Sequence, residues 1–316
     1  MCTGIFLKTK DNEYIFARTL EFGLQLKWIQ LCNNYLKGTI GYFPDDNNCF
    51  MTDGVNKHGL FVGTFFYPHY NSEYNKVQLP DKINLETGEI NQYLLENCSN
   101  IEEIITILGK LNILETVINN TKFSLHWIAC DTTGKCIVIE IRDKEILFYN
   151  NPHNVITNSP SFPEHVLELK KYAYLSKYDK PRSWSQGTGA LGLPGDSSSS
   201  SRFIRANFYR KNMLIPDNTK DGIEAILRVL HNFDIPLGTV EDPNTGEKEV
   251  TEYTVAYSLN NFYSNYADYG YIMDKDGIWK QTNSPIKKCY RGITIMLIIL
   301  LYFFVCIIFY LICKKK

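Results

Sequence analysis

The beginning of the chain decides the fold, in residues 1–22, MCTGIFLKTKDNEYIFARTLEF. Residues 2–8 and 13–19 mix apolar and β-branched side chains, as strands do, and residues 9–12, TKDN, carry turn chemistry. The pattern predicts a β-hairpin. With the turn at residues 10–12, Cys2 lies opposite residues 19–21. At a rise of about 3.3 Å per residue, Arg18 and Glu21 then come within side-chain reach of Cys2.

Removal of Met1 would make Cys2 the first residue, with a thiol and a free α-amine on one carbon. An ordinary thiol has a pKa of about 8.5 and is mostly protonated at neutral pH, whereas an α-amine with a pKa of about 8 can accept its proton. Nucleophile and base would then come from one residue, the N-terminal-nucleophile arrangement. Arg18 would favour the thiolate and Glu21 would orient the α-amine. The alternatives are lipidation near the N-terminus and an exposed Arg–Glu pair that contributes little.

Composition gives bounds on the remaining functions. The 316 residues suffice for one large domain or two small ones, and a net charge of −1 gives no electrostatic footprint for nucleic acid. The nine cysteines form no C-x-x-C pair, and the six histidines are dispersed. We therefore expect reduced, mostly buried thiols, structural or surface histidines, and neither a metal nor a cofactor.

Downstream patterns predict a layered α+β domain, because strand-rich ends enclose helices. Apolar β-rich runs predict strands at 59–67, 123–130, 136–141 and 145–150, and a final strand pair within 250–273 around Asn260-Asn261. Helical periodicity predicts helices at 89–110, 162–177, 202–213 and 220–233. The serine run 197–201 is typical of a flexible surface loop.

The C-terminal segment has the character of a membrane span. Residues 293–312, ITIMLIILLYFFVCIIFYLI, carry no charge, and as a helix they would be about 30 Å long. Basic residues flank the segment at both ends, so they do not set its orientation. A buried core helix is the alternative. We predict a linker at 283–292, a transmembrane helix at 293–312 and a basic tail at 313–316. The N-terminus has no apolar secretory signal, so we expect a single-pass C-terminal anchor with the catalytic domain in the cytosol.

Several separated motifs together resemble the choloylglycine hydrolase family, which includes bile salt hydrolases and penicillin V acylases. The resemblance covers roughly residues 2–280, in the family's order. It implies a four-layer αββα sandwich over a catalytic domain at 1–282, and a homo-oligomer, because relatives are commonly tetramers. The matching segments are MCTG at 1–4, FARTLEF at 16–22, DGVNKHGL at 53–60, LHW at 125–127, TNSPSF at 157–162 and GTGALGLPGDSSSSSRFIR at 187–205.

The resemblance also implies roles for individual residues. Cys2 matches the nucleophile, Arg18 and Arg202 match two active-site arginines, and Asn158 matches the asparagine whose side chain lines the oxyanion hole. The alternatives are a turn before Pro160 for Asn158 and a surface charge at a helix start for Arg202.

Two positions depart from the family pattern. Glu21 stands where the family usually has Asp. The second oxyanion position, Asn in bile salt hydrolases and Tyr in penicillin V acylases, falls at Phe66. Phenylalanine has no side-chain donor, so only its backbone N–H would serve, which is closer to the Tyr-bearing branch and puts bile salt specificity in doubt.

The sequence therefore predicts a membrane-anchored cysteine amidase that hydrolyses a linear amide bond of an N-acyl small molecule, without a cofactor and with the lipid bilayer as its second partner. Two alternatives stay open. One is a membrane-tethered binding protein that keeps the fold without turnover, and the other is an acyltransferase that uses an amine instead of water.

Overall fold

A computed structural model describes most of the chain. The predicted linker at 283–292, membrane segment at 293–312 and basic tail at 313–316 lie outside the described residues. None of the helices in the described part is long and apolar enough to cross a bilayer. The described residues are 1–21, 27–42, 49–68, 73–118, 121–179, 186–243, 246, 248–261, 272–273 and 279–280.

The predicted hairpin is confirmed, and it forms the middle of a four-stranded sheet. Strand β1 (Cys2–Lys8) pairs antiparallel with β2 (Tyr14–Glu21), and Cys2 lies opposite Leu20. The outer strands are β14 (Val155–Ile156) beside β1 and β15 (Thr251–Ser258) beside β2. Residues from both ends and the middle of the chain therefore meet in one sheet.

The second sheet has seven strands. The four strands predicted between residues 59 and 150 are present, but β3, β4 and β5 were missed. Glycines and charged residues interrupt the apolar pattern there, as in LKGTIGY and CFMTDGVN. The strand order is β13 (Glu145–Asn150), β12 (Cys136–Arg142), β11 (Leu125–Cys130), β6 (Phe61–Phe66), β5 (Cys49–Asn56), β4 (Leu36–Tyr42) and β3 (Lys27–Cys32).

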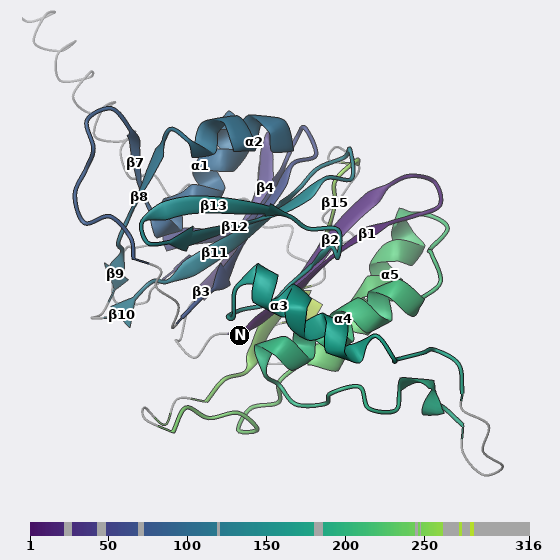
Figure 1. The fold of residues 1–316 in the computed structure, drawn as a ribbon. Helices are drawn as coiled ribbons and strands as arrows, with labels where there is room; N and C mark the ends of the chain where they lie inside the picture. The colour runs from purple at the N-terminus through teal and green to yellow at the C-terminus, as the bar shows by residue number, and fades with distance from the viewer. Residues whose placement is uncertain are drawn as a thin grey trace, which may run out of the picture. The chain divides into compact units, whose positions relative to one another are not determined.

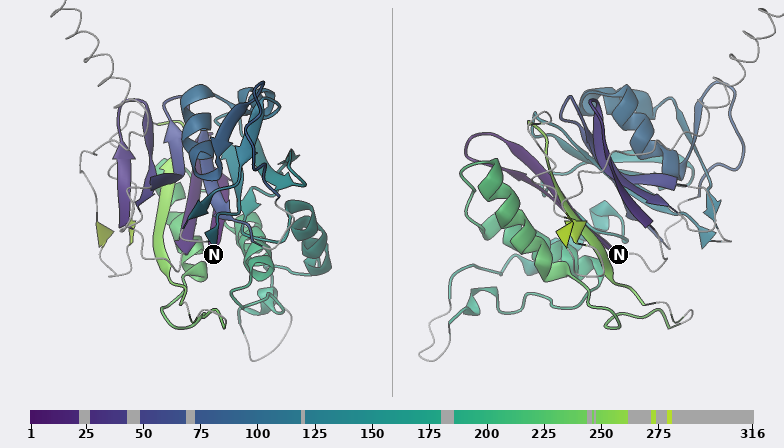
Figure 2. Two further views of the ribbon diagram at one scale, coloured as in Figure 1. Left: turned by 90° about the vertical axis from the view of Figure 1, so that its left-hand side faces the viewer. Right: turned by 180° about the vertical axis from the view of Figure 1, so that it is seen from behind.

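The two sheets face each other and helices cover their outer faces (Figure 1, Figure 2). Between the sheets, Phe16 stacks on Phe61 with ring centroids 3.9 Å apart. One buried apolar cluster joins both sheets to α4 and α5, and a second joins the other face of the seven-stranded sheet to α1 and α2. The layers therefore run helix, sheet, sheet, helix, in the predicted αββα order. The helices are α1 (Ile90–Asn97), α2 (Ile101–Leu108), α3 (Phe162–Leu169), α4 (Ser199–Asn212) and α5 (Thr219–Leu230).

Two sequence-based helix boundaries were wrong. The single helix predicted at 89–110 is two helices, because Cys98 is extended and Asn100 caps α2 by accepting a hydrogen bond from the Glu103 N–H at 3.0 Å. Of the strand pair predicted within 250–273, β15 is present and pairs with β2, whereas residues 262–271 lie outside the described residues. The helix predicted at 162–177 ends earlier, at Leu169. The remaining short elements are β7 (Ile83–Glu86), β8 (Leu111–Leu114), β9 (Val117–Ile118), β10 (Thr121–Lys122), β16 (Ile272–Met273), β17 (Trp279–Lys280) and 3₁₀ turns at Thr87–Glu89, Lys170–Tyr172, Thr188–Ala190 and His231–Phe233.

Gly4, on β1, lies where the two sheets come close. A larger side chain at this position should therefore destabilise the fold. A Cβ atom at this position would stand 2.7 Å from Phe65 and 2.8 Å from Phe16. Overpacking of this kind costs about 1–3 kcal/mol. We expect Gly4→Ala to lower the free energy of unfolding by about that amount, measured as the midpoint of urea unfolding.

Gly109→Ala is the matched control, because its Cβ would meet nothing within 4 Å and its φ of −64° suits any residue. Equal unfolding midpoints for the two variants would contradict the close packing at Gly4.

Candidate active site

The backbone of Cys2 points its N–H away from β2. Met1 and Glu21 exchange both backbone hydrogen bonds, at 2.7 and 2.8 Å, so Cys2 and Leu20 form the next, non-hydrogen-bonded pair. The Cys2 N–H, which does not bond to β2, therefore faces the side of β1 on which β14 lies. There it donates to Asn158 Oδ1 at 2.7 Å. The Cys2 side chain is buried, on the same sheet face as Arg18.

Asn158 follows β14 by two residues, which brings it level with the beginning of β1. Its side-chain oxygen accepts from Cys2 and from Arg202 Nη2 at 2.8 Å. Its side-chain nitrogen donates to the Phe66 carbonyl at 2.8 Å. An amide nitrogen carries two hydrogens, so a second N–H is left to face a ligand. Asn158 is thus more than the turn residue that the alternative interpretation expected.

Arg202 reaches the same place from α4. Its Nη1 donates to the Cys2 carbonyl and to Thr3 Oγ1, the latter at 2.9 Å. The side chain is 1% exposed, which excludes the alternative of a surface charge. Burial lowers the pKa of the Arg202 guanidinium, while Glu21, Cys2 and Glu249 act to raise it. The guanidinium thereby ties the first strand, the Asn158 side chain and α4 together.

Arg18 is fully buried between the sheets and stacks on Phe65, 4.3 Å from the ring centroid. Its Nη1 donates to the carbonyls of Thr52 and Thr64, at 3.1 and 2.7 Å, where β5 and β6 no longer pair with each other. Asp53 Oδ2 lies 3.4 Å away. Arg18 is thus not an exposed partner of Glu21 on a hairpin.

The pKa of Arg18 is raised. Burial lowers it, but the surrounding acidic groups outweigh burial, and Cys2 is one of them. Arg18 Nη2 has no hydrogen-bond partner within the described parts of the chain. The guanidinium therefore keeps its charge, and both N–H groups of Nη2 are left without a partner among the described residues.

Glu21 does not hold the Cys2 nitrogen, contrary to our expectation. It lies one residue beyond Leu20 on β2, so its side chain is on the opposite sheet face from the Cys2 thiol. Its Oε1 accepts from Thr251 Oγ1 at 3.0 Å. Burial raises the pKa of the Glu21 carboxyl, against the lowering effect of the N-terminal ammonium and Arg202. The place predicted for Glu21 beside the Cys2 nitrogen is taken by Asn158.

Phe66 lies at the end of β6, and its carbonyl rather than its N–H is in contact with Asn158. In a strand, the N–H and C=O of one residue point to the same side. The Phe66 N–H therefore faces the side on which Asn158 lies. Its use as an oxyanion donor stays a prediction.

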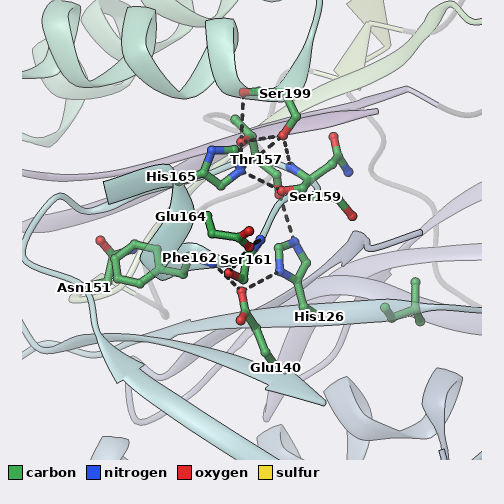
Figure 3. Close-up of polar contacts among 12 residues, drawn as sticks. His126, Glu140, Asn151, Thr157, Ser159, Ser161, Phe162, Glu164, His165 and Ser199 are labelled. Carbon is green, nitrogen blue, oxygen red and sulfur yellow. Dashed lines mark hydrogen bonds and ion pairs between the residues drawn. The ribbon is translucent and has the colours of Figure 1, made fainter. Parts of the chain in front are cut away.

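Sequence reasoning missed a second set of polar residues around the turn that follows β14, and Figure 3 shows His126, Glu140, His165 and Ser199 there. The serine run is not a flexible loop, because Ser198 caps α4 and Ser199 Oγ accepts from the Asn158 N–H at 2.9 Å. Two histidines that we interpreted as structural or surface residues, His126 and His165, contact the same turn. The motif LHW contained one of them, but nothing in the spacing connects them to residue 158.

The arrangement brings together a thiol, two buried guanidinium groups and an amide with a spare N–H. Cations beside a thiol favour its thiolate, and a fixed amide N–H stabilises an oxyanion. These are the elements of nucleophilic attack on a carbonyl carbon. Among the described residues, no cluster of His, Cys, Asp and Glu has the form of a metal site.

Comparison with known proteins agrees with this chemistry. Residues 2–274 match the family described as linear amide C–N hydrolases, choloylglycine hydrolase family. An uncharacterized protein of Paramecium bursaria Chlorella virus 1 is 37% identical over 272 residues, which are 83% of this chain and 94% of that protein. The bile salt hydrolase/transferase of Clostridium perfringens is 32% identical over 302 residues, covering 84% of this chain and 89% of the relative.

Solved structures show the same relationship. The crystal structure of a mutant conjugated bile acid hydrolase from Clostridium perfringens has a TM-score of 0.72 and 27% identity, and the match covers 92% of this chain and 97% of that one. The penicillin V acylase of Agrobacterium tumefaciens, at 20% identity and a TM-score of 0.62, shares the fold. With a family match over most of its length and relatives above 30% identity, the chain belongs to the choloylglycine hydrolase family of linear amide C–N hydrolases.

Proposed function

We propose that the chain is a membrane-anchored cysteine amidase that cleaves the linear amide bond of an N-acyl compound, with Cys2 as its N-terminal nucleophile. The hydrogen bond from the Cys2 nitrogen to Asn158 Oδ1, at 2.7 Å, carries the proposal. After removal of Met1 this nitrogen becomes the α-amine. Asn158 Oδ1 would then accept a hydrogen bond from one N–H of the α-amine. The lone pair of the α-amine would point away from Asn158.

The proposed reaction uses the residues gathered at Cys2. The α-amine takes the thiol proton, and the thiolate attacks the amide carbonyl. The second N–H of Asn158 and the Phe66 backbone N–H stabilise the oxyanion, and one such donor is typically worth about 3 kcal/mol of barrier. The α-ammonium returns its proton to the departing amine, and water then hydrolyses the thioester. Arg18 favours the thiolate, and Arg202 keeps Asn158 in place.

The first functional test asks whether Met1 is removed and whether turnover needs the Cys2 thiol. We expect the intact mass of the purified protein to lack Met1, and an N-acyl substrate to add its acyl mass at Cys2. The assays use a glycine-conjugated bile salt, penicillin V and an N-acyl amino acid. Cys2→Ala should lose the adduct and all measurable turnover, because no other group supplies the nucleophile.

Cys130→Ala is the control, since this buried thiol lies on β11 within the seven-stranded sheet and should leave turnover unchanged. A mature protein that keeps Met1 would refute the proposed mechanism. If the protein binds these compounds but does not turn them over, the result would support the alternative of a membrane-tethered binding protein.

The membrane anchor and the cytosolic placement are proposals that rest on the uncharged run at 293–312. The anchor suits an amphiphilic substrate that partitions into the bilayer. A homo-oligomer stays a prediction from the resemblance.

The anchor can be tested by inserting charge. Each Arg at the centre of a spanning helix costs about 2.5–3.5 kcal/mol of insertion. We expect Leu301→Arg with Val305→Arg to move the protein from the alkali-resistant membrane fraction into the soluble fraction. Leu214→Arg with Leu237→Arg is the control, because these side chains are 88% and 71% exposed and add the same charge. If both double variants stay in the membrane fraction, residues 293–312 are not the anchor.

Acyl transfer is the second candidate, because several relatives are bile salt hydrolase/transferases. The same thioester would react with an amine instead of water. We expect product analysis with added glycine to show mainly the free acid. A glycine conjugate that exceeds the free acid at millimolar glycine would make transfer the main activity.

A further inference from the structure

The turn that carries Asn158, residues 157–161, is held by side chains and not by strand pairing. The Asn158 N–H donates to Ser199 Oγ at 2.9 Å, and the Asn158 carbonyl accepts from His165 Nε2 at 2.9 Å. The preceding carbonyl, of Thr157, accepts from His126 Nε2 at 2.9 Å (Figure 3). A carbonyl only accepts, so both imidazoles carry their proton on Nε2. Two consecutive carbonyls are therefore held by two histidines.

His126 also has Tyr67 and Glu140 as neighbours. It lies on β11, is buried, and stacks on Tyr67 with ring centroids 4.6 Å apart. Its Nδ1 is 3.6 Å from Glu140 Oε1 on β12. The same carboxylate oxygen accepts from the Phe162 N–H at 2.7 Å, at the first residue of α3. Glu140 thus lies beside His126 and, through the Phe162 N–H, holds the end of the turn to the seven-stranded sheet (Figure 3).

His165 approaches the turn from α3. It stacks on Phe203, the neighbour of Arg202 on α4, with ring centroids 4.7 Å apart. Burial lowers the pKa of His165 to about 4, so the ring is neutral at neutral pH and has one N–H to donate. That N–H goes to Asn158. His165 Nδ1 has no partner within the described parts of the chain.

We propose that His126 and His165 are positioning residues, which set the place of the Asn158 amide against Cys2 by holding the carbonyls of Thr157 and Asn158. The proposal rests on the proposed function, in which Asn158 stabilises the oxyanion. Displacing a reacting or stabilising group by about 1 Å can cost 100-fold in rate. Neither histidine touches the substrate carbonyl in this account, and both act through Asn158.

Two matched substitutions at His165 separate positioning from packing. In His165→Gln the amide nitrogen can stand where Nε2 stood, whereas in His165→Asn it reaches only as far as Nδ1. Both are polar and neutral. The same pair is made at His126, so that a folded Asn variant is obtained at one position or the other. His58→Asn is the control, because His58 is exposed and does not contact residues 157–161.

The assay compares two reactions of the Cys2 thiol in the mature protein. Acylation by p-nitrophenyl acetate passes through an oxyanion, whereas alkylation by iodoacetamide does not. We expect the Asn variants to slow acylation by roughly 10- to 100-fold and to leave alkylation within about twofold of wild type. The Gln variants should recover most of the acylation rate. In an Asn158→Ala background, His165→Asn should cause no further loss.

Each outcome has one meaning. If wild-type Cys2 is not acylated by the ester, the proposed function fails and this inference fails with it. If wild type is acylated and folded Asn variants have its acylation-to-alkylation ratio, only the inference is overturned. An equal loss from His165→Asn with and without Asn158, or an equal loss in both reactions, would show a structural role only.

Discussion

The hydrogen bond between the Cys2 nitrogen and the Asn158 side chain joins residues 156 positions apart, and the arrangement of the site depends on it. It exists because of strand register. Cys2 falls at a non-hydrogen-bonded position opposite Leu20, so its N–H is left for a partner on the other side of β1. β14 runs along that side and ends two residues before Asn158. A shift of one residue in the hairpin would turn both the thiol and the N–H away.

The hairpin could be predicted from sequence because its information is local. Apolar and β-branched side chains on both sides of a polar turn predicted both strands and their register, and they placed Cys2 opposite residues 19–21. The same local reasoning failed for Glu21, since reach along a strand ignores the face on which a side chain lies. It also failed for β3 to β5. Glycines and charged residues interrupt the apolar pattern there, and these strands are stabilised by pairing within the complete sheet.

The rest of the site is non-local. Asn158 and Arg202 could be named only through the family resemblance, because no spacing rule connects them to residue 2. His126 and His165 were missed for the same reason, since their common target is formed only after β11, α3 and β14 have packed. Arg18 was predicted correctly as a neighbour of Cys2 in the sheet, but its contacts with Thr52 and Thr64 depend on where β5 and β6 separate.

The initiator methionine occupies a place in the sheet. Its backbone exchanges two hydrogen bonds with Glu21, and its ammonium lies 3.1 Å from the Glu249 carboxylate. An exopeptidase must draw the terminal residue into its own cleft, and a residue held by Glu21 and Glu249 resists this. The proposed function therefore requires that methionine is cleaved from the nascent chain before β1 docks. In a chain that folds first, the proposed nucleophile Cys2 would stay an internal residue, with its nitrogen in a peptide bond to Met1.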